Sequence, residues 1–283
     1  MTGVNTAQLG VYAALSPPVI YVWIRHGKPG FLGWFYLFAF CSLRVVGGAM
    51  TLKNSKNSSA SLISNIGLSP LLLATSGLLH EARHYRNARL RKNFEWTLVG
   101  LYHLLVAAGV GLVAAGASAV NKNSGTAPKQ SDVTILKVGI TTLLVSWSLV
   151  CIWAVFSLLP SQKTTPALGY IPGTKILFVV LLSLPFTGIR VLYSTVSIFS
   201  DNASLNPVTG SIGLRVGLSF IPELVSALMF ILVGLATRQV MGIARYRGDG
   251  RGNANGMEAD VKMGRRQRRS DIKGSDVGLG AGN

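Results

Sequence analysis

The sequence predicts an all-α, polytopic membrane protein, a seven-transmembrane-helix bundle followed by a basic tail. Three observations support this fold class. Apolar residues make up 49% of the 283 residues, and the mean hydropathy is +0.43. Charged residues make up only 13%, roughly half the share found in soluble proteins. They are also unevenly distributed, because 14 of the 37 charged side chains lie in residues 242–283. The remaining 241 residues have too few charges to cover the surface of a soluble domain.

Seven segments are apolar and long enough to cross a bilayer, which takes roughly 20 residues. They are expected to be helices, because a helix satisfies its own backbone hydrogen bonds in lipid, and they lack the two-residue alternation of β-barrel strands. Stretches containing polar residues, glycine or proline separate them. The predicted spans are 7–24, 31–52, 60–79, 96–120, 133–159, 174–199 and 212–240.

Two regions follow from this division. Residues 1–241 form the predicted transmembrane domain. Residues 242–283 are rich in Gly, Asn, Asp and Arg, with few large apolar side chains, and such a composition predicts a disordered tail.

The distribution of lysine and arginine predicts the orientation, because these residues accumulate in cytoplasmic loops. With the N-terminus outside, the cytoplasmic segments contain 19 of them and the outer segments contain 4. The cytoplasmic segments are then 25–30, 80–95, 160–175 and the tail from Arg238. The predicted topology therefore has the N-terminus outside and the C-terminus in the cytosol.

Features of the predicted outer side agree with this orientation. No basic residue precedes Arg25, so the first span is expected to stay as an anchor rather than be cleaved as a signal peptide. Two Asn-x-Ser/Thr sequons, at Asn57 and Asn202, fall in predicted outer loops. The expected location is a multi-pass position in the plasma membrane or an endomembrane.

Three charged residues lie inside predicted spans at a similar depth. Arg44, Arg190 and Glu223 all fall roughly 4–5 Å outward of the bilayer midplane, at about 1.5 Å of rise per residue. Charges at this depth are costly and usually face the interior of a bundle, and Glu223 is the only carboxylate in any predicted span. We therefore expect Glu223 to bridge to Arg44, to Arg190 or to both. Two interpretations stay open: a structural clamp, and a ligand or proton site.

Prolines gather near the same level. Pro70 lies at the centre of the third predicted span, Pro185 precedes Arg190 by five residues, and Pro222 adjoins Glu223, while Pro17-Pro18 interrupts the first span. Proline removes an intrahelical hydrogen bond and kinks the helix. The kinks could open a polar pocket, as broken helices do in transporters, or they could be the ordinary kinks of membrane helices.

The sequence His80-Glu81-Ala82-Arg83-His84 matches the H-E-x-x-H pattern of zinc proteases. There, two histidines on one helix face bind the metal, and the glutamate acts as general base on the bound water. A third ligand is missing from the expected position, since residue 87 is Asn. The alternative interpretation is a basic loop whose His and Arg side chains face lipid headgroups. No nucleotide-binding or Ser-His-Asp pattern is present, so no cofactor is predicted and an enzyme is less expected than a non-enzymatic protein.

The tail carries a basic cluster of Arg265, Arg266, Arg268 and Arg269. Such clusters bind anionic lipid, so membrane lipids are the expected partners, together with a small-molecule or lipid ligand in the bundle. A topology or trafficking signal is the other interpretation of the cluster. A nucleic-acid partner is not predicted, because the asymmetry between the two sides of the membrane already explains the net charge of +17.

The run Gly67-Leu68-Ser69-Pro70-Leu71-Leu72-Leu73-Ala74-Thr75-Ser76-Gly77-Leu78-Leu79, preceded by Arg44-Val45-Val46-Gly47-Gly48, resembles a family of fungal seven-helix integral membrane proteins of unknown function. The resemblance covers roughly residues 7–241 and implies a multi-pass membrane protein without assigning an activity. The sequence thus favours a receptor-like or transporter-like protein, with a zinc-dependent membrane protease and a structural membrane scaffold as alternatives.

Overall fold

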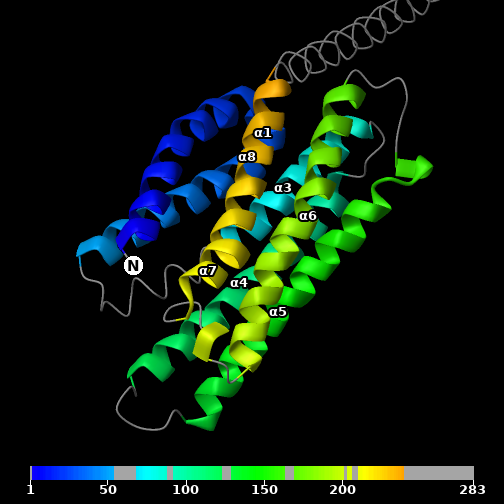
Figure 1. The fold of residues 1–283 in the computed structure, drawn as a ribbon. Helices are drawn as coiled ribbons and strands as arrows, with labels where there is room; N and C mark the ends of the chain where they lie inside the picture. The colour runs from blue at the N-terminus through cyan, green and yellow to red at the C-terminus, as the bar shows by residue number, and fades with distance from the viewer. Residues whose placement is uncertain are drawn as a thin grey trace, which may run out of the picture. The chain divides into compact units, whose positions relative to one another are not determined.

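The computed structural model describes residues 2–53, 68–87, 92–122, 129–162, 169–200, 203–205 and 210–238. All regular structure in these ranges is helical (Figure 1). The long helices are α1 (Thr2–Lys53), α3 (Leu68–Arg86), α4 (Lys92–Lys122), α5 (Gln130–Phe156), α6 (Tyr170–Phe199) and α8 (Ile221–Ala236). Short elements are the 3-10 turns Pro160–Gln162 and Ala203–Leu205, helix α7 (Ile212–Arg215) and the π-helical turn Val216–Phe220.

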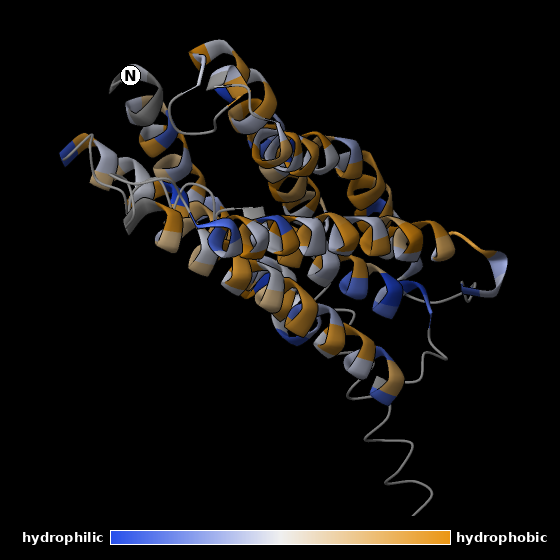
Figure 2. Cartoon of the chain, turned by 90° about the horizontal axis from the view of Figure 1, so that it is seen from below, coloured by the Kyte–Doolittle hydropathy of each residue, from blue (hydrophilic) through white to orange (hydrophobic). Residues whose placement is uncertain are grey.

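The surface of the bundle is apolar in the way that contact with lipid requires. Five helices of the described part are long and apolar enough to cross a membrane, if the run from Ile212 to Ala236 is taken as one. Large apolar side chains point outward along them, among them Leu104 and Ile152, each 67% exposed. Hydrophobic residues occur along the length of the helices (Figure 2). A soluble protein rarely exposes so continuous an apolar surface, and the chain is a helical, polytopic integral membrane protein.

Helix α1 is a hairpin of two helical halves rather than one straight rod. Gly27 has φ 62° and ψ −150°, a conformation that glycine adopts at no steric cost. The ring centroids of Tyr12 and Phe40 lie 5.2 Å apart, whereas 28 residues of straight helix would separate them by about 42 Å. Trp23 and Phe38 likewise approach to 6.2 Å. The two halves therefore lie side by side (Figure 1), and the break falls within the predicted turn 25–30.

Helix α3 differs from the expectation of a span at 60–79. Residues 54–67 lie outside the described residues, and α3 continues to Arg86. In the described part, Pro70 is consequently the third residue of α3 and does not lie at the centre of the helix. The first turn of a helix tolerates the missing amide hydrogen of proline. The backbone of α3 approaches the second half of α1 closely at Gly77, where an added Cβ would lie 2.5 Å from the amide nitrogen of Gly33.

Helices α4, α5 and α6, and the continuous helical run from Ile212 to Ala236, begin and end within four residues of the predicted spans. Helices α4 and α5 approach closely along their glycine-containing halves, because a Cβ added at Gly139 would lie 2.6 Å from the amide nitrogen of Val113. Helices α6 and α8 pack beside α3 and α1 (Figure 1). Residues 239–283 lie outside the described residues.

Candidate functional site

The structure brings the three intramembrane charges into contact. Arg44 lies on the second half of α1, Arg190 on α6 and Glu223 in the first turn of α8. The Nε atom of Arg190 donates to Oε1 of Glu223 at 2.6 Å, and Nη2 of Arg44 donates to the same oxygen. All three side chains are buried, with Glu223 0%, Arg190 1% and Arg44 3% exposed. One carboxylate therefore connects three helices inside the bundle.

The surroundings of this ion-pair cluster are partly polar and partly aromatic. Arg190 also donates from Nη1 to the hydroxyl of Ser194, one turn along α6. The guanidinium of Arg44 lies 5.5 Å from the centre of the Phe40 ring. Within the described residues, neither Oε2 of Glu223 nor the buried hydroxyl of Tyr12 has a hydrogen-bond partner. With two arginines and one glutamate, these three side chains together carry a net charge of +1.

Prolines set the local geometry on both sides of the cluster. The π-helical turn Val216–Phe220 ends immediately before α8, and Pro222 occupies the start of that helix. π-Turns of this kind occur often at functional sites, and here the turn ends three residues before Glu223. Pro185 lies inside α6, about one and a half turns before Arg190. Two cavities in the described part, one beside Lys137 and one beside Arg83, are lined neither by the three charged residues nor by these prolines. The prolines therefore shape the helices beside the cluster without lining either of these cavities.

The His80-Glu81-x-x-His84 motif is not assembled as a zinc site. Its residues are helical, because α3 includes them, and both oxygens of Glu81 are engaged by residues of α1. His80 instead packs on Trp96, with ring centroids 5.3 Å apart. The described residues contain no group of three or more His, Cys, Asp or Glu side chains placed to hold a metal ion. The alternative of a headgroup-facing loop is also wrong for this stretch, because His80 and Glu81 are 5% and 0% exposed.

Glu81 belongs to a second buried cluster that sequence reasoning missed. Its Oε1 lies 2.6 Å from Nδ1 of His26, and its Oε2 accepts from Nε1 of Trp34 at 3.0 Å. Nε2 of His26 lies 3.0 Å from the carbonyl oxygen of Gly234, with the hydroxyl of Thr237 at 3.4 Å. We call these five residues the His26 cluster. It joins the break of α1 to the end of α3 and the end of α8.

The acceptors around His26 define the proton content of this cluster. A carbonyl oxygen only accepts hydrogen bonds, so Nε2 of His26 must donate to Gly234. The contact between Nδ1 and Glu81 then needs a proton as well, because an unprotonated nitrogen and a carboxylate would repel each other at 2.6 Å. The pair shares this proton and carries no net charge, which allows it to be fully buried.

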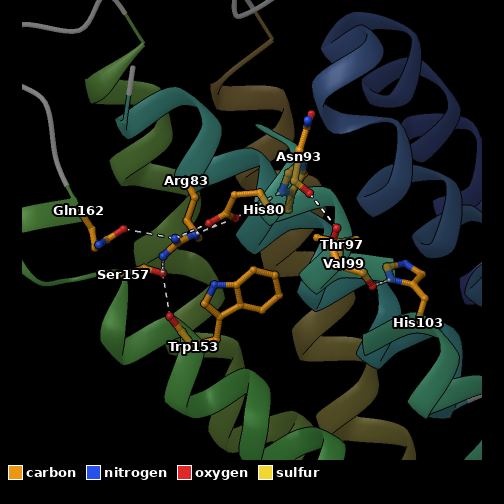
Figure 3. Close-up of polar contacts among 10 residues, drawn as sticks. His80, Arg83, Asn93, Thr97, Val99, His103, Trp153, Ser157 and Gln162 are labelled. Carbon is orange, nitrogen blue, oxygen red and sulfur yellow. Dashed lines mark hydrogen bonds and ion pairs between the residues drawn. The ribbon is translucent and has the colours of Figure 1, made fainter. Parts of the chain in front are cut away.

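A third cluster forms where α3, α4 and α5 meet (Figure 3). Arg83 donates to both oxygens of Glu95, at 3.2 Å from Nε and 2.6 Å from Nη2. It also donates to the hydroxyl of Ser157 at 2.8 Å and to Oε1 of Gln162 at 3.2 Å. Its guanidinium lies 5.8 Å from the centre of the Trp153 ring. Nearly every donor of Arg83 is used inside the protein, so this arginine does not reach lipid headgroups as predicted for a loop.

Comparison with known proteins now identifies the family. Residues 1–240 match a family described as a domain of unknown function (DUF7702). The chain belongs to this family. Its fold resembles the crystal structure of Exiguobacterium sibiricum rhodopsin, with a TM-score of 0.51 and 11% sequence identity, over 85% of this chain and 98% of that one. At this identity the likeness concerns the fold alone. No curated protein matches the chain.

Several predicted sites lie outside the part of the DUF7702 protein that the structure describes. They include the sequons at Asn57 and Asn202 and the tail cluster of Arg265, Arg266, Arg268 and Arg269. The tail cluster also follows residue 240, where the family match ends. Its binding to anionic lipid stays a prediction.

Proposed function

We propose that this DUF7702 protein crosses the membrane seven times, with its N-terminus outside and its C-terminus in the cytosol. The two halves of α1 count as separate spans in this topology, as does α3. Polar contacts support the alternation, because the ends predicted to be cytosolic meet each other. His26 at the break of α1 contacts Gly234 near the end of α8, and Arg86 at the end of α3 donates to the carbonyl of Ser157 at the end of α5.

The topology is tested with short epitope tags at both ends of the chain in intact cells. A protease added outside should remove the N-terminal tag and leave the C-terminal tag until the membrane is permeabilised. An even number of spans would put both tags on one side, and cleavage of both tags, or of neither, in intact cells would therefore contradict the proposal.

We further propose that the protein is receptor-like or transporter-like and that the ion-pair cluster of Arg44, Arg190 and Glu223 holds one of its conformations. The observation that carries this proposal is the complete burial of a carboxylate shared by two arginines from different helices. Ionisable groups at membrane depth are costly and usually mark ligand pathways, proton relays or conformational devices. A static scaffold remains the second candidate, because a permanent clamp would use the same contacts.

A native thiol distinguishes the two candidates. Cys41 lies one turn before Arg44 on α1 and is 0% exposed, so a water-soluble methanethiosulfonate reagent reaches it only if the cluster opens. The experiment uses the Cys151→Ser background, where Cys41 is the remaining cysteine. A moving bundle should label Cys41 slowly, and Glu223→Gln should speed labelling at least about tenfold, which corresponds to 1.4 kcal/mol of opening free energy.

A second reporter separates local opening from unfolding. Ala154 on α5 is also 0% exposed, and a variant with Cys41→Ser, Cys151→Ser and Ala154→Cys places one thiol away from the cluster. Labelling at Cys41 with protection at position 154 supports a conformational role. Complete protection of Cys41 in both the parent and the Glu223→Gln protein, or equal labelling of the two reporters, favours the scaffold.

A further inference from the structure

A groove opens between α4 and α5 beside the Arg83–Glu95 pair. Its volume is about 530 Å³, which is within the range of small-ligand sites. The two helices touch through glycine at their other ends, as at Gly139. At this end, large side chains of both helices line the groove instead. The groove is lined chiefly by apolar side chains, including Leu98, Leu149, Ile152 and Phe156.

The position of the groove indicates that its occupant comes from the bilayer. Ile152 on its rim is 67% exposed and Phe94 is 65% exposed, and both belong to the apolar surface that faces lipid in a membrane protein. An occupant that enters from this side must itself be hydrophobic over most of its length.

Charge at the closed end argues against an ionic headgroup. Arg83 lines the groove, but Glu95 neutralises it through two hydrogen bonds, and Ser157 and Gln162 take further donors. Figure 3 shows Arg83 directed toward Ser157 and Gln162. A phosphate would have to displace Glu95, and an ammonium group would meet Arg83. The groove is therefore suited to an uncharged molecule.

A buried hydroxyl beside the groove lacks a partner among the described residues. Tyr102 lines the cavity and is 6% exposed, and within the described residues its buried hydroxyl makes no hydrogen bond. It follows Glu95 by seven residues and Leu98 by four, so all three lie on one face of α4. A buried hydroxyl is normally satisfied, and an oxygen on the occupant would satisfy this one.

We propose that the groove between α4 and α5 binds a neutral lipid with a single hydroxyl group, the chemistry of a membrane sterol, and that Tyr102 hydrogen-bonds this hydroxyl. The apolar walls contact the body of the lipid, and the paired Arg83 and Glu95 exclude charged headgroups.

The test uses the full chain in phosphatidylcholine nanodiscs with a photoreactive, alkyne-tagged sterol. Labelling should saturate, map to residues 94–105 and 149–156, and be displaced by unlabelled sterol. Tyr102→Phe removes only the hydroxyl and should weaken labelling roughly three- to tenfold, the effect of one lost hydrogen bond. Ile152→Trp fills the groove mouth and should abolish labelling. Its matched control is Leu104→Trp, because Leu104 is equally exposed at 67% but does not line the groove, and labelling should be unchanged.

Other outcomes overturn the proposal. Labelling that does not saturate, or that both groove variants leave intact, would mean that the sterol is ordinary surrounding lipid. Equal competition by added phosphatidylcholine would mean that the groove takes an acyl chain. If Ile152→Trp abolishes labelling and Tyr102→Phe leaves it unchanged, the groove binds lipid, but Tyr102 does not recognise a hydroxyl group and the proposal is wrong. Circular dichroism and gel filtration check that each variant is folded.

Discussion

The shared carboxylate of the ion-pair cluster predicts an unequal response to removing each charge. Glu223→Gln keeps the size of the side chain but raises the net charge of the cluster from +1 to +2, because it removes the carboxylate that Arg44 and Arg190 share. Removing one partner from a buried ion pair costs about 3–5 kcal/mol. Arg44→Gln instead brings the net charge to zero, and Glu223 keeps its 2.6 Å bond to Arg190. The cost should then be that of one charged hydrogen bond, about 1.5–3 kcal/mol.

The measurement is the free energy of unfolding in mixed micelles, followed by tryptophan fluorescence. Lys137→Gln is the matched control, because it also removes a single charge but lies near the edge of a span. The ammonium group of Lys137 lies 5.3 Å from the centre of the Phe199 ring. Loss of that contact should cost less than about 1 kcal/mol. The double variant Glu223→Arg with Arg190→Glu retains two arginines and one glutamate, and should recover stability lost in either single reversal. If Arg44→Gln were the more damaging change, or Glu223→Gln no worse than Lys137→Gln, the shared-carboxylate argument would be refuted.

Three further predictions concern other parts of the chain. Trp34→Phe removes the donor to Glu81 while keeping an aromatic ring, and should lower the free energy of unfolding by about 1.5–3 kcal/mol; an unchanged value in the same micelle assay would contradict the description of the His26 cluster. Gly77→Ala must separate α1 and α3 and should cost about 1–3 kcal/mol, whereas Gly111→Ala, with no atom within 4 Å of an added Cβ, should be neutral or stabilising. Replacing the four arginines of the tail cluster at 265–269 with glutamine should weaken binding of the chain's tail to anionic vesicles by about 1 kcal/mol per residue; binding that neither these changes nor added salt reduce would exclude an electrostatic contact.

Much of the helical layout can be predicted from hydropathy, because a span must be apolar and of a certain length. The same reasoning predicts that Glu223 lies near Arg44 and Arg190, since unpaired charges at one depth are too costly to keep apart. These contacts could be anticipated without a structure because the membrane leaves so few places for a charge. Hydropathy does not predict whether Glu223 contacts both arginines or only one, because this depends on how each helix is rotated about its own axis.

Hydropathy fails where charges are paired inside the protein. The charged residues near the end of α3 lowered the apolarity of that segment and led to a predicted loop, yet Arg83 and Arg86 are 6% and 5% exposed within the helix. Their partners are Glu95 on α4 and Ser157 beyond α5, and contacts so distant along the chain leave no local pattern. His26 lies in the predicted turn between the first two spans, and hydropathy gives no sign that it is buried there.

Helix α8 is held at two points, and this arrangement restricts how the bundle can move. Glu223 near its start binds Arg44 on α1 and Arg190 on α6, while Gly234 near its end accepts from His26 at the break of α1. The two points are 11 residues apart, about 16 Å along the helix. Sliding α8 along α1 would break both clusters at once, whereas a tilt about one end would break only the other. A tilt about the Gly234 end would preserve the neutral His26–Glu81 pair and open the Glu223 cluster, whose Oε2 has no hydrogen-bond partner within the described residues, and this is the motion that labelling of Cys41 would detect.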